Sequence, residues 1–212
     1  MVRARGTARD RVVKVAVELF AEHGVQGTSL QMIADRIGVG KAAVYYQFRS
    51  KEDIVLAVIR PVFDDVARLV ESAEALPQKE SRRDAAIAGL VALMVALRNA
   101  SFPFRRDRQI DRIVARHPEL RAVTDRFYGL LLGPDHDDAT RVAMTVAITG
   151  IYCCATDPTL QNIAAPELGA AMLDCFKLCV ARVSAPVPPA AKPPTPAATQ
   201  PDAALRDWAP CR

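Results

Sequence analysis

The sequence predicts an all-α protein, and three observations support that class. Apolar residues recur at intervals of three and four along most of the first 185 residues, which is the spacing of one helix face. No stretch shows the sustained alternation with β-branched residues that is typical of strands. Proline or glycine stands at the breaks between these periods, for example at Pro77, Pro118 and Gly133. We therefore expect helices joined by short turns.

The first helix is expected to begin after Thr7, because Thr7 with Asp10 three residues later resembles a capping box. Its apolar face repeats from Val12 to Phe20, and Gly24 stands where the helix would end. A helix-turn-helix is expected next, between residues 28 and 48. Further helices are expected over residues 51–76, 82–100, 104–116, 119–132, 138–155 and 166–183.

The end of the chain has a different composition. Eight of the fifteen prolines lie between Pro186 and Pro210. Such a segment cannot pair its backbone regularly, so we expect an extended, disordered tail, with a short docking motif around Trp208 as the alternative. The predicted domains are residues 1–50, a helix-turn-helix domain that binds DNA; residues 51–184, a larger helical domain; and residues 185–212, the Pro-rich tail.

The positive charge is concentrated in the first sixty residues. The chain has 28 basic and 24 acidic residues, a net charge of +4. Ten of the basic and six of the acidic residues lie in the first sixty, which leaves eighteen of each elsewhere. A small excess of this kind can arise by chance, but its position favours a polyanionic partner for the N-terminal segment.

The chain shows no secretory signal and no apolar run of the length that spans a bilayer, so we expect a cytoplasmic protein without a membrane partner. Five cysteines on such a chain favour reduced thiols. Cys153, Cys154, Cys175 and Cys179 lie on two predicted helices. A soft-metal site or a redox switch is one interpretation of this group, and buried cysteines that act as small apolar residues are the other.

The segment from Thr28 to Phe48 predicts a helix-turn-helix. Thr28 followed by Gln31 is a second capping box pattern, and the helix that it starts ends at Gly38, which can adopt the positive φ of a sharp turn. The second helix then runs from Lys41 to Phe48, with Val44 and Phe48 turned inward. The alternative is an ordinary helical hairpin whose tyrosines are packed in a core.

The inward residues leave a face that suits the DNA major groove. On it, the lysine would meet a phosphate or a guanine edge, the alanine methyls would meet thymine, and the tyrosine hydroxyls would reach phosphates. The start of the first motif helix suits another phosphate. The predicted DNA contacts are Thr28, Ser29, Gln31, Lys41, Ala42, Ala43, Tyr45, Tyr46, Gln47 and Lys51.

Residues 7–60 resemble the DNA-binding domain of TetR-family transcriptional regulators. The resemblance rests on a first helix that ends Leu-Phe-Ala-Glu-His-Gly and on the spacing of Ile33-Ala34, Gly38-Val39, Tyr45, Phe48 and Lys51-Glu52. Two departures from the family pattern concern the second motif helix. Gly40 stands where the family usually has Ser or Thr, and Ala42 where glycine is common. The fold is compatible with both, whereas the bases that are read would differ.

The resemblance implies a homodimer on a palindromic operator, with a C-terminal domain that binds a small, largely apolar effector and then releases DNA. The last two helices would form the dimer through small and apolar residues, namely Ala143, Ala147, Gly150, Ala170, Ala171, Leu173 and Leu178. The candidate ligand-binding residues are Leu90, Leu93, Met94, Leu97, Phe102, Phe104, Phe127, Tyr128, Met144, Ile148 and Tyr152. Arg98, Asn99, Thr145 and Thr149 are polar groups that would orient a ligand. Any single apolar residue of this kind is more often plain core.

Nothing in the sequence favours an enzyme. His23, His117 and His136 show no metal-ligand spacing, and no nucleophile, phosphate or dinucleotide motif is present, so we expect no catalytic residues, no cofactor and no metal. The acidic loop at residues 135–138 is more simply a solvated turn. Two other functions remain open at this point: a ligand-independent architectural or chromosome-organising DNA-binding protein, and a helical small-molecule or metal carrier whose helix-turn-helix no longer reads DNA.

Overall fold

The computed structural model describes residues 7–98, 107–134 and 136–183, and within these ranges every regular element is helical. The elements are α1 (Ala8–Gly27), α2 (Leu30–Ile37), α3 (Lys41–Gln47), α4 (Lys51–Glu74), α5 (Lys79–Leu97), α6 (Arg108–Arg116), α7 (Pro118–Leu132), α8 (Asp138–Thr156), a short 3-10 helix η1 (Pro158–Leu160) and α9 (Ala165–Val183). The all-α prediction is confirmed. Phe102, Phe104, Asn99 and the predicted tail lie outside the described residues.

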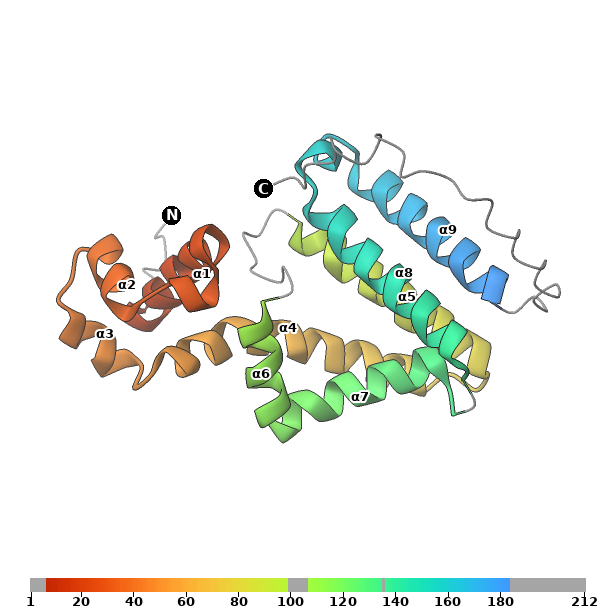
Figure 1. Ribbon diagram of the computed structural model, residues 1–212, viewed down its shortest axis with the longest axis horizontal. Helices are drawn as coiled ribbons and strands as arrows, with labels where there is room; N and C mark the ends of the chain where they lie inside the picture. Colours follow the sequence, from red (N-terminus) through yellow and green to blue (C-terminus); the bar gives the residue numbers. More distant parts are fainter. Residues whose placement is uncertain (1–6, 99–106, 135, 184–212) are drawn as a thin grey trace, which may run out of the picture.

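The first apolar core lies beneath α1, α2 and α3, at one end of the molecule (Figure 1). Ala16, Ile33 and Val44 come from these three helices and are fully buried together. The first half of α4 completes this core from below, and Ile110, Ile113 and Leu120 close it from α6 and α7. The small N-terminal helices therefore do not form a core by themselves.

The second core is formed by α5, α7, α8 and α9, together with the second half of α4. Figure 1 shows α8 and α5 running side by side, with α9 beyond α8. Helices α4 and α5 approach each other closely at Gly89. A β-carbon at this position would lie 2.4 Å from Leu69 Cδ1, so the glycine leaves room for Leu69. Pro61 lies inside α4 and does not interrupt it.

Polar contacts connect α4 to the corner between α6 and α7. Arg116 donates to Glu52 at 2.9 Å, and Arg60 donates to Glu119 at 3.0 Å. His117 lies between the two carboxylates, with Nε2 3.3 Å from Glu52 and Nδ1 3.4 Å from Glu119. Two arginine–glutamate ion pairs and the His117 contacts thus hold the part of α4 nearest the N-terminal helices against α6 and α7.

Candidate nucleic-acid interface

The first motif helix, α2, begins at Ser29 and not at Thr28 as the sequence pattern suggested. The Ser29 hydroxyl accepts a hydrogen bond from the Met32 amide at 3.1 Å, which is the standard N-cap arrangement. Gln31 donates to Asp35 at 2.7 Å and does not return to the cap. The prediction of a capping box between Thr28 and Gln31 is therefore wrong: the N-cap is Ser29, one residue later, and it caps the helix without a reciprocal bond from Gln31.

The turn that follows α2 has the predicted geometry. Gly38 has φ +78°, in the left-handed region, and its amide donates to the carbonyls of Ala34 and Asp35. A side chain here would meet no atom within 4 Å, so glycine is favoured by the backbone angle alone. The turn brings α3 across α2, and α3 is then anchored by Val44 and Phe48, which are both buried.

The outward side of α3 is exposed as predicted. Tyr46 is 89% exposed, and Tyr45 is also exposed with the Lys41 ammonium 5.7 Å from its ring centroid. Ala42 and Ala43 are exposed, and Gln47 is half-buried. Two large aromatic side chains in water are unusual for a protein surface that has no partner. The arrangement can insert a helix with a lysine, two methyl groups and two phenols into a groove.

Thr28 and Lys51 are used by the fold and not by the outer face. Thr28 is only 1% exposed, and its hydroxyl donates toward the carbonyls of Leu19 at 3.1 Å and Gly24 at 2.8 Å. The Lys51 ammonium donates to the carbonyls of Val25 at 2.8 Å, Gln26 at 3.3 Å and Thr28 at 3.0 Å. All three ammonium hydrogens are thus engaged at the end of α1. These contacts within the domain speak against a phosphate contact through the Thr28 and Lys51 side chains, which stays an untested prediction.

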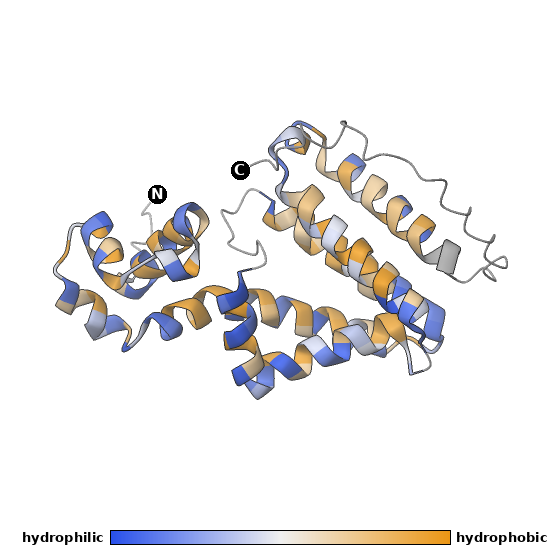
Figure 2. Ribbon diagram, in the orientation of Figure 1, coloured by the Kyte–Doolittle hydropathy of each residue, from blue (hydrophilic) through white to orange (hydrophobic). Residues whose placement is uncertain are grey.

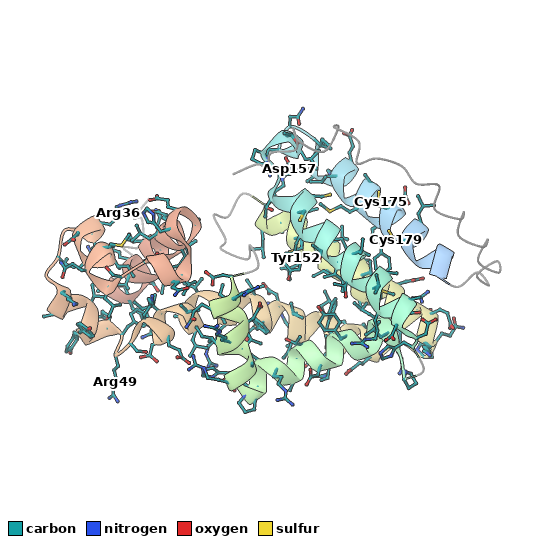
Figure 3. All side chains as sticks on the ribbon, in the orientation of Figure 1. Arg36, Arg49, Tyr152, Asp157, Cys175 and Cys179 are labelled. Carbon is teal, nitrogen blue, oxygen red and sulfur yellow. The ribbon has the colours of Figure 1, made fainter. Side chains whose placement is uncertain are left out.

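The arginines of α2 and of the segment after α3 differ in whether a carboxylate neutralises them. Arg36 forms a two-pronged pair with Glu22, at 3.2 and 2.9 Å. Arg49 is exposed, and among the described residues no carboxylate pairs with it. Figure 3 shows Arg49 projecting away from the ribbon just after α3, whereas Arg36 lies on the far side of the domain. Sequence reasoning did not single out Arg49, although a basic residue directly after the second motif helix was a usable signal.

A hollow of about 290 Å³ separates the first turns of α1 from α3. Arg11 of α1 and Tyr46 of α3 both line it, together with apolar residues that include Val12 and Val39. Arg9, in the first turn of α1, reaches the C-terminal end of α3. Its guanidinium lies 4.1 Å from the centroid of the Phe48 ring. The start of α1 and the outer helix thus share one surface.

Comparison with known proteins identifies the domain that carries this surface. Residues 12–58 match the bacterial regulatory proteins of the tetR family. The N-terminal domain of this chain is thus similar to that of the TetR-family regulators. The matched residues include α2, the Gly38 turn and α3, so the helix-turn-helix described above lies within the part that resembles this family.

Individual proteins resemble this chain in two respects, namely the sequence of a short segment and the fold of most of the chain. The HTH-type transcriptional regulator RutR of Escherichia coli (strain K12) is 36% identical over 62 residues, and this stretch spans 29% of each protein. Mycobacterium smegmatis AmtR is 21% identical with a TM-score of 0.54 over 88% of this chain and 99% of its own. Bacillus subtilis FadR, solved in complex with stearoyl-CoA, is 18% identical with a TM-score of 0.52 over 81% of this chain and 97% of its own. The structural likeness shows that the C-terminal helices share the fold.

The predicted ligand-binding residues gather in the second core. Leu90, Met94, Phe127, Met144 and Ile148 are buried there, and Leu93, Leu97 and Tyr152 pack against them. Burial raises the pKa of Tyr152, and Tyr128 adds to this effect. Tyr128 itself is exposed, with its ring edge-on to Phe127 at 6.2 Å. A hollow of about 390 Å³ opens between α4 and α5, and of the predicted set it touches Leu93.

The four cysteines lie along α8 and α9, where Figure 3 labels Cys175 and Cys179. Cys153 and Cys175 are exposed, and the other two are half-buried against the second core. Burial raises the pKa of the Cys154 thiol, and the neighbouring thiols of Cys153 and Cys175 raise it further. Within the ranges that the structure describes, no group of three or more His, Cys, Asp or Glu side chains is placed to hold a metal ion.

The outer side of α8 and α9 is apolar. Val142 and Val146 of α8 and Leu178 of α9 are large aliphatic side chains that remain well exposed, at 63%, 59% and 69%. Figure 2 shows α8 as one of the most continuously hydrophobic helices. It is also the one helix among the described residues that is long and apolar enough to cross a membrane, by length and composition only. Part of its apolar surface is buried in the second core.

Proposed function

We propose that this chain is a cytoplasmic, sequence-specific DNA-binding transcriptional regulator, a repressor and not an enzyme. The observation that carries the proposal is the outer face of α3. A short helix held from behind by Val44 and Phe48 presents Lys41 and two exposed tyrosines, next to cations that no carboxylate neutralises among the described residues. A major groove accepts one helix, and Lys, Tyr and alanine methyl groups match its edges and phosphates.

The proposed active form is a homodimer through α8 and α9, bound to a palindromic operator. Val142, Val146 and Leu178 are exposed on two adjacent helices, and packing against a second copy would cover them. The small residues Ala143, Gly150, Ala170 and Ala171 on the same two helices would allow close approach of a second helix pair. A two-fold axis here would place two copies of α3 on one side of the DNA.

The proposed effector is a small, largely apolar molecule that binds among α5, α7 and α8. The chemistry of the second core supports this choice, because its buried side chains, such as Leu90, Phe127 and Met144, are aliphatic, aromatic or thioether groups. The structural relative FadR was solved with stearoyl-CoA, whose acyl chain is apolar. Arg98, the residue that follows α5, donates to the Ile163 carbonyl at 2.9 Å and so links the end of α5 to the segment before α9.

Asp107 offers a route from the effector domain to the reading helices. Its Oδ1 accepts from the Gln109 amide at 2.8 Å and so caps α6, while its Oδ2 accepts from the Val25 amide at 2.7 Å at the end of α1. One carboxylate thus bridges the effector-side helix α6 and the helix that supports α2. We propose that ligand binding moves α6, that this bridge and the Glu52–His117–Glu119 contacts carry the shift to α1 and α4, and that operator affinity then falls.

The experiment is a salt-dependent gel shift with duplexes enriched by the wild-type chain from a random pool. Binding to one palindromic sequence at nanomolar concentration is the expected result, and equal binding to every duplex would contradict it in favour of an architectural protein. Tyr46→Ala and Lys41→Ala should each weaken binding to the enriched duplex about tenfold with helicity and dimerisation intact. Tyr128→Ala, which removes an exposed tyrosine from α7, is the matched control and should bind like the wild type.

A further inference from the structure

The reading helix α3 has little intrinsic support. It has seven residues, its N-cap Gly40 has no side chain to accept a hydrogen bond, and its last turn contains no basic residue. Helices of this length are unstable alone, and the carbonyls of their last turn need partners from elsewhere. Val44 and Phe48 anchor α3 through buried apolar side chains, which accept or donate no hydrogen bond at its C-terminal end.

Arg9 supplies the missing support at that end. Its Nη1 donates to the Gln47 carbonyl at 3.1 Å, and its guanidinium carbon lies 4.1 Å from the centre of the Phe48 ring. A cation beside the last carbonyls of a helix interacts favourably with the helix dipole, and stacking on an aromatic ring adds a cation–π contact. Phe48 is 2% exposed partly because this guanidinium covers it. Arg9 therefore holds α1 and the end of α3 together across 38 positions of sequence.

These contacts leave most of the guanidinium unused. An arginine has five N–H groups, and only one of them donates to Gln47. Within the described residues no carboxylate pairs with Arg9, in contrast to Arg36, whose two terminal nitrogens are bound by Glu22. The side chain of Arg9 is exposed, on the surface that α1 shares with α3. A cation that is ordered by contacts with protein and still has free donors is suited to a phosphate.

We propose that Arg9 is a positioning residue for the reading helix: it fixes the angle of α3 and, with its remaining N–H groups, binds a phosphate of the DNA strand beside α3. The inference rests on the proposed function, because it takes the partner of α3 to be duplex DNA. It adds that sequence discrimination depends on a residue of α1 that contacts no base. The charge of Arg9 acts on every duplex, whereas the angle of α3 matters only for the sequence that α3 reads.

The test compares four proteins: the wild type, Arg9→Gln, Arg9→Lys and Lys14→Gln. Lys14 is exposed on the same helix without a described contact to α3, so it serves as a control for charge. Each protein is titrated over a range of salt with the enriched duplex and with a scrambled duplex of the same composition. Circular dichroism establishes that the variants keep the helicity of the wild type, as expected for a substitution at an exposed site.

Arg9→Gln should bind the enriched duplex about tenfold more weakly and reduce the salt dependence by about one phosphate contact. Its ratio of enriched to scrambled affinity should also fall, which a purely electrostatic role would not cause. Arg9→Lys should restore the salt dependence but not the ratio, because an ammonium cannot stack flat on Phe48 and hydrogen-bond as arginine does. Lys14→Gln should leave the ratio unchanged.

The inference is overturned if both Arg9 variants discriminate between the two duplexes as well as the wild type does. It is overturned in its second part, the phosphate contact, if Arg9→Gln keeps the full salt dependence. A wild-type chain that enriches no duplex is a separate result, which overturns the proposed function itself. The two failures are therefore distinguished by whether the wild type discriminates.

Discussion

The reading helices and the C-terminal helices achieve their order in different ways. Around α1–α3, individual polar contacts define where elements begin and end: the box between Thr7 and Asp10, the Ser29 cap and the Lys51 ammonium on three carbonyls. In the second core, α5 and α7 begin without a side-chain cap, although Asp137 caps α8, and the helices are held together mainly by apolar packing. Among the reading helices, only α3 begins without such a cap. Directional contacts specify one geometry, as reading a groove requires, whereas apolar packing tolerates rearrangement around a ligand or a second copy.

The largest expected effect tests the apolar half of this comparison. Val146→Arg would place a charge in the proposed contact between two copies, with no partner to neutralise it. Dimerisation should weaken about a hundredfold or more, because an unpaired buried charge costs several kcal/mol. Sedimentation equilibrium measures the change. Ala122→Arg, on the exposed side of α7, is the control and should leave the dimer unchanged. A fully dimeric Val146→Arg protein would refute the α8–α9 interface.

The next effect tests the directional half. Lys51→Met keeps the aliphatic stem but leaves the carbonyls of Val25, Gln26 and Thr28 without their donor. We expect the free energy of unfolding to fall by about 2 kcal/mol, since buried acceptors without partners are costly. Urea denaturation of this variant is compared with that of Lys14→Met, which removes an exposed ammonium with no described partner. Equal stability of the two variants would show that the three contacts are not structural.

A glycine-to-alanine substitution should change the stability of the protein in opposite directions in the two regions. Gly38→Ala forces a β-carbon into a left-handed turn with φ +78° and should destabilise the protein by about 1 kcal/mol. Gly129→Ala lies inside α7, where an added β-carbon meets no atom within 4 Å, and should stabilise the protein by up to about 1 kcal/mol. Thermal unfolding of both variants checks the prediction. Shifts of the same sign would remove the distinction between the two glycines.

The smallest effect concerns an ion pair at the edge of the second core. The Arg126 guanidinium, which donates to Glu74, holds the pKa of that carboxyl below its ordinary value. The pair therefore contributes stability above about pH 4.5, the ordinary value, and loses it as the pH falls through the lower pKa of the folded state. Glu74→Gln should unfold more easily than the wild type at pH 7 and equally easily at pH 2. A difference that persists in acid would point to lost packing.

Sequence patterns predicted the interiors of the helices better than their ends. Apolar periodicity records which face is buried, so every long helix was expected in its place. The ends of α8 and α9 agree within one residue, whereas the helix expected over residues 82–100 runs from Lys79 to Leu97. The start of α2 was missed because Thr28 and Ser29 both suit a cap, and the choice depends on carbonyls of α1 that need the Thr28 hydroxyl. These carbonyls lie outside residues 28–31, so the pattern of those four residues cannot indicate which of Thr28 and Ser29 is the cap.

The same limit applies to the candidate interface. Exposure of Tyr45 and Tyr46 followed from the inward spacing of Val44 and Phe48, and the structure confirms it. Lys51 was assigned to a phosphate because a lysine near a helix start suits either role, and only the fold shows that its hydrogens are already engaged. Arg9 is the opposite case, since nothing in the sequence near it indicates that its partner is the end of α3.

The sharing of α4 between the two cores has a practical consequence for building chimeric sensors from this chain. A graft cut before α4 would remove the side chains that complete the first core, among them Ile54, Val55, Val58 and Ile59. The isolated reading module would then expose its own interior and would not be expected to fold. A transplantable unit must instead take α4 beyond Ile59 and bring a matching α6, whose Ile110 and Ile113 seal the same core. The boundary for exchanging the DNA-binding part and the C-terminal part of this chain therefore lies within α4 and not in a linker.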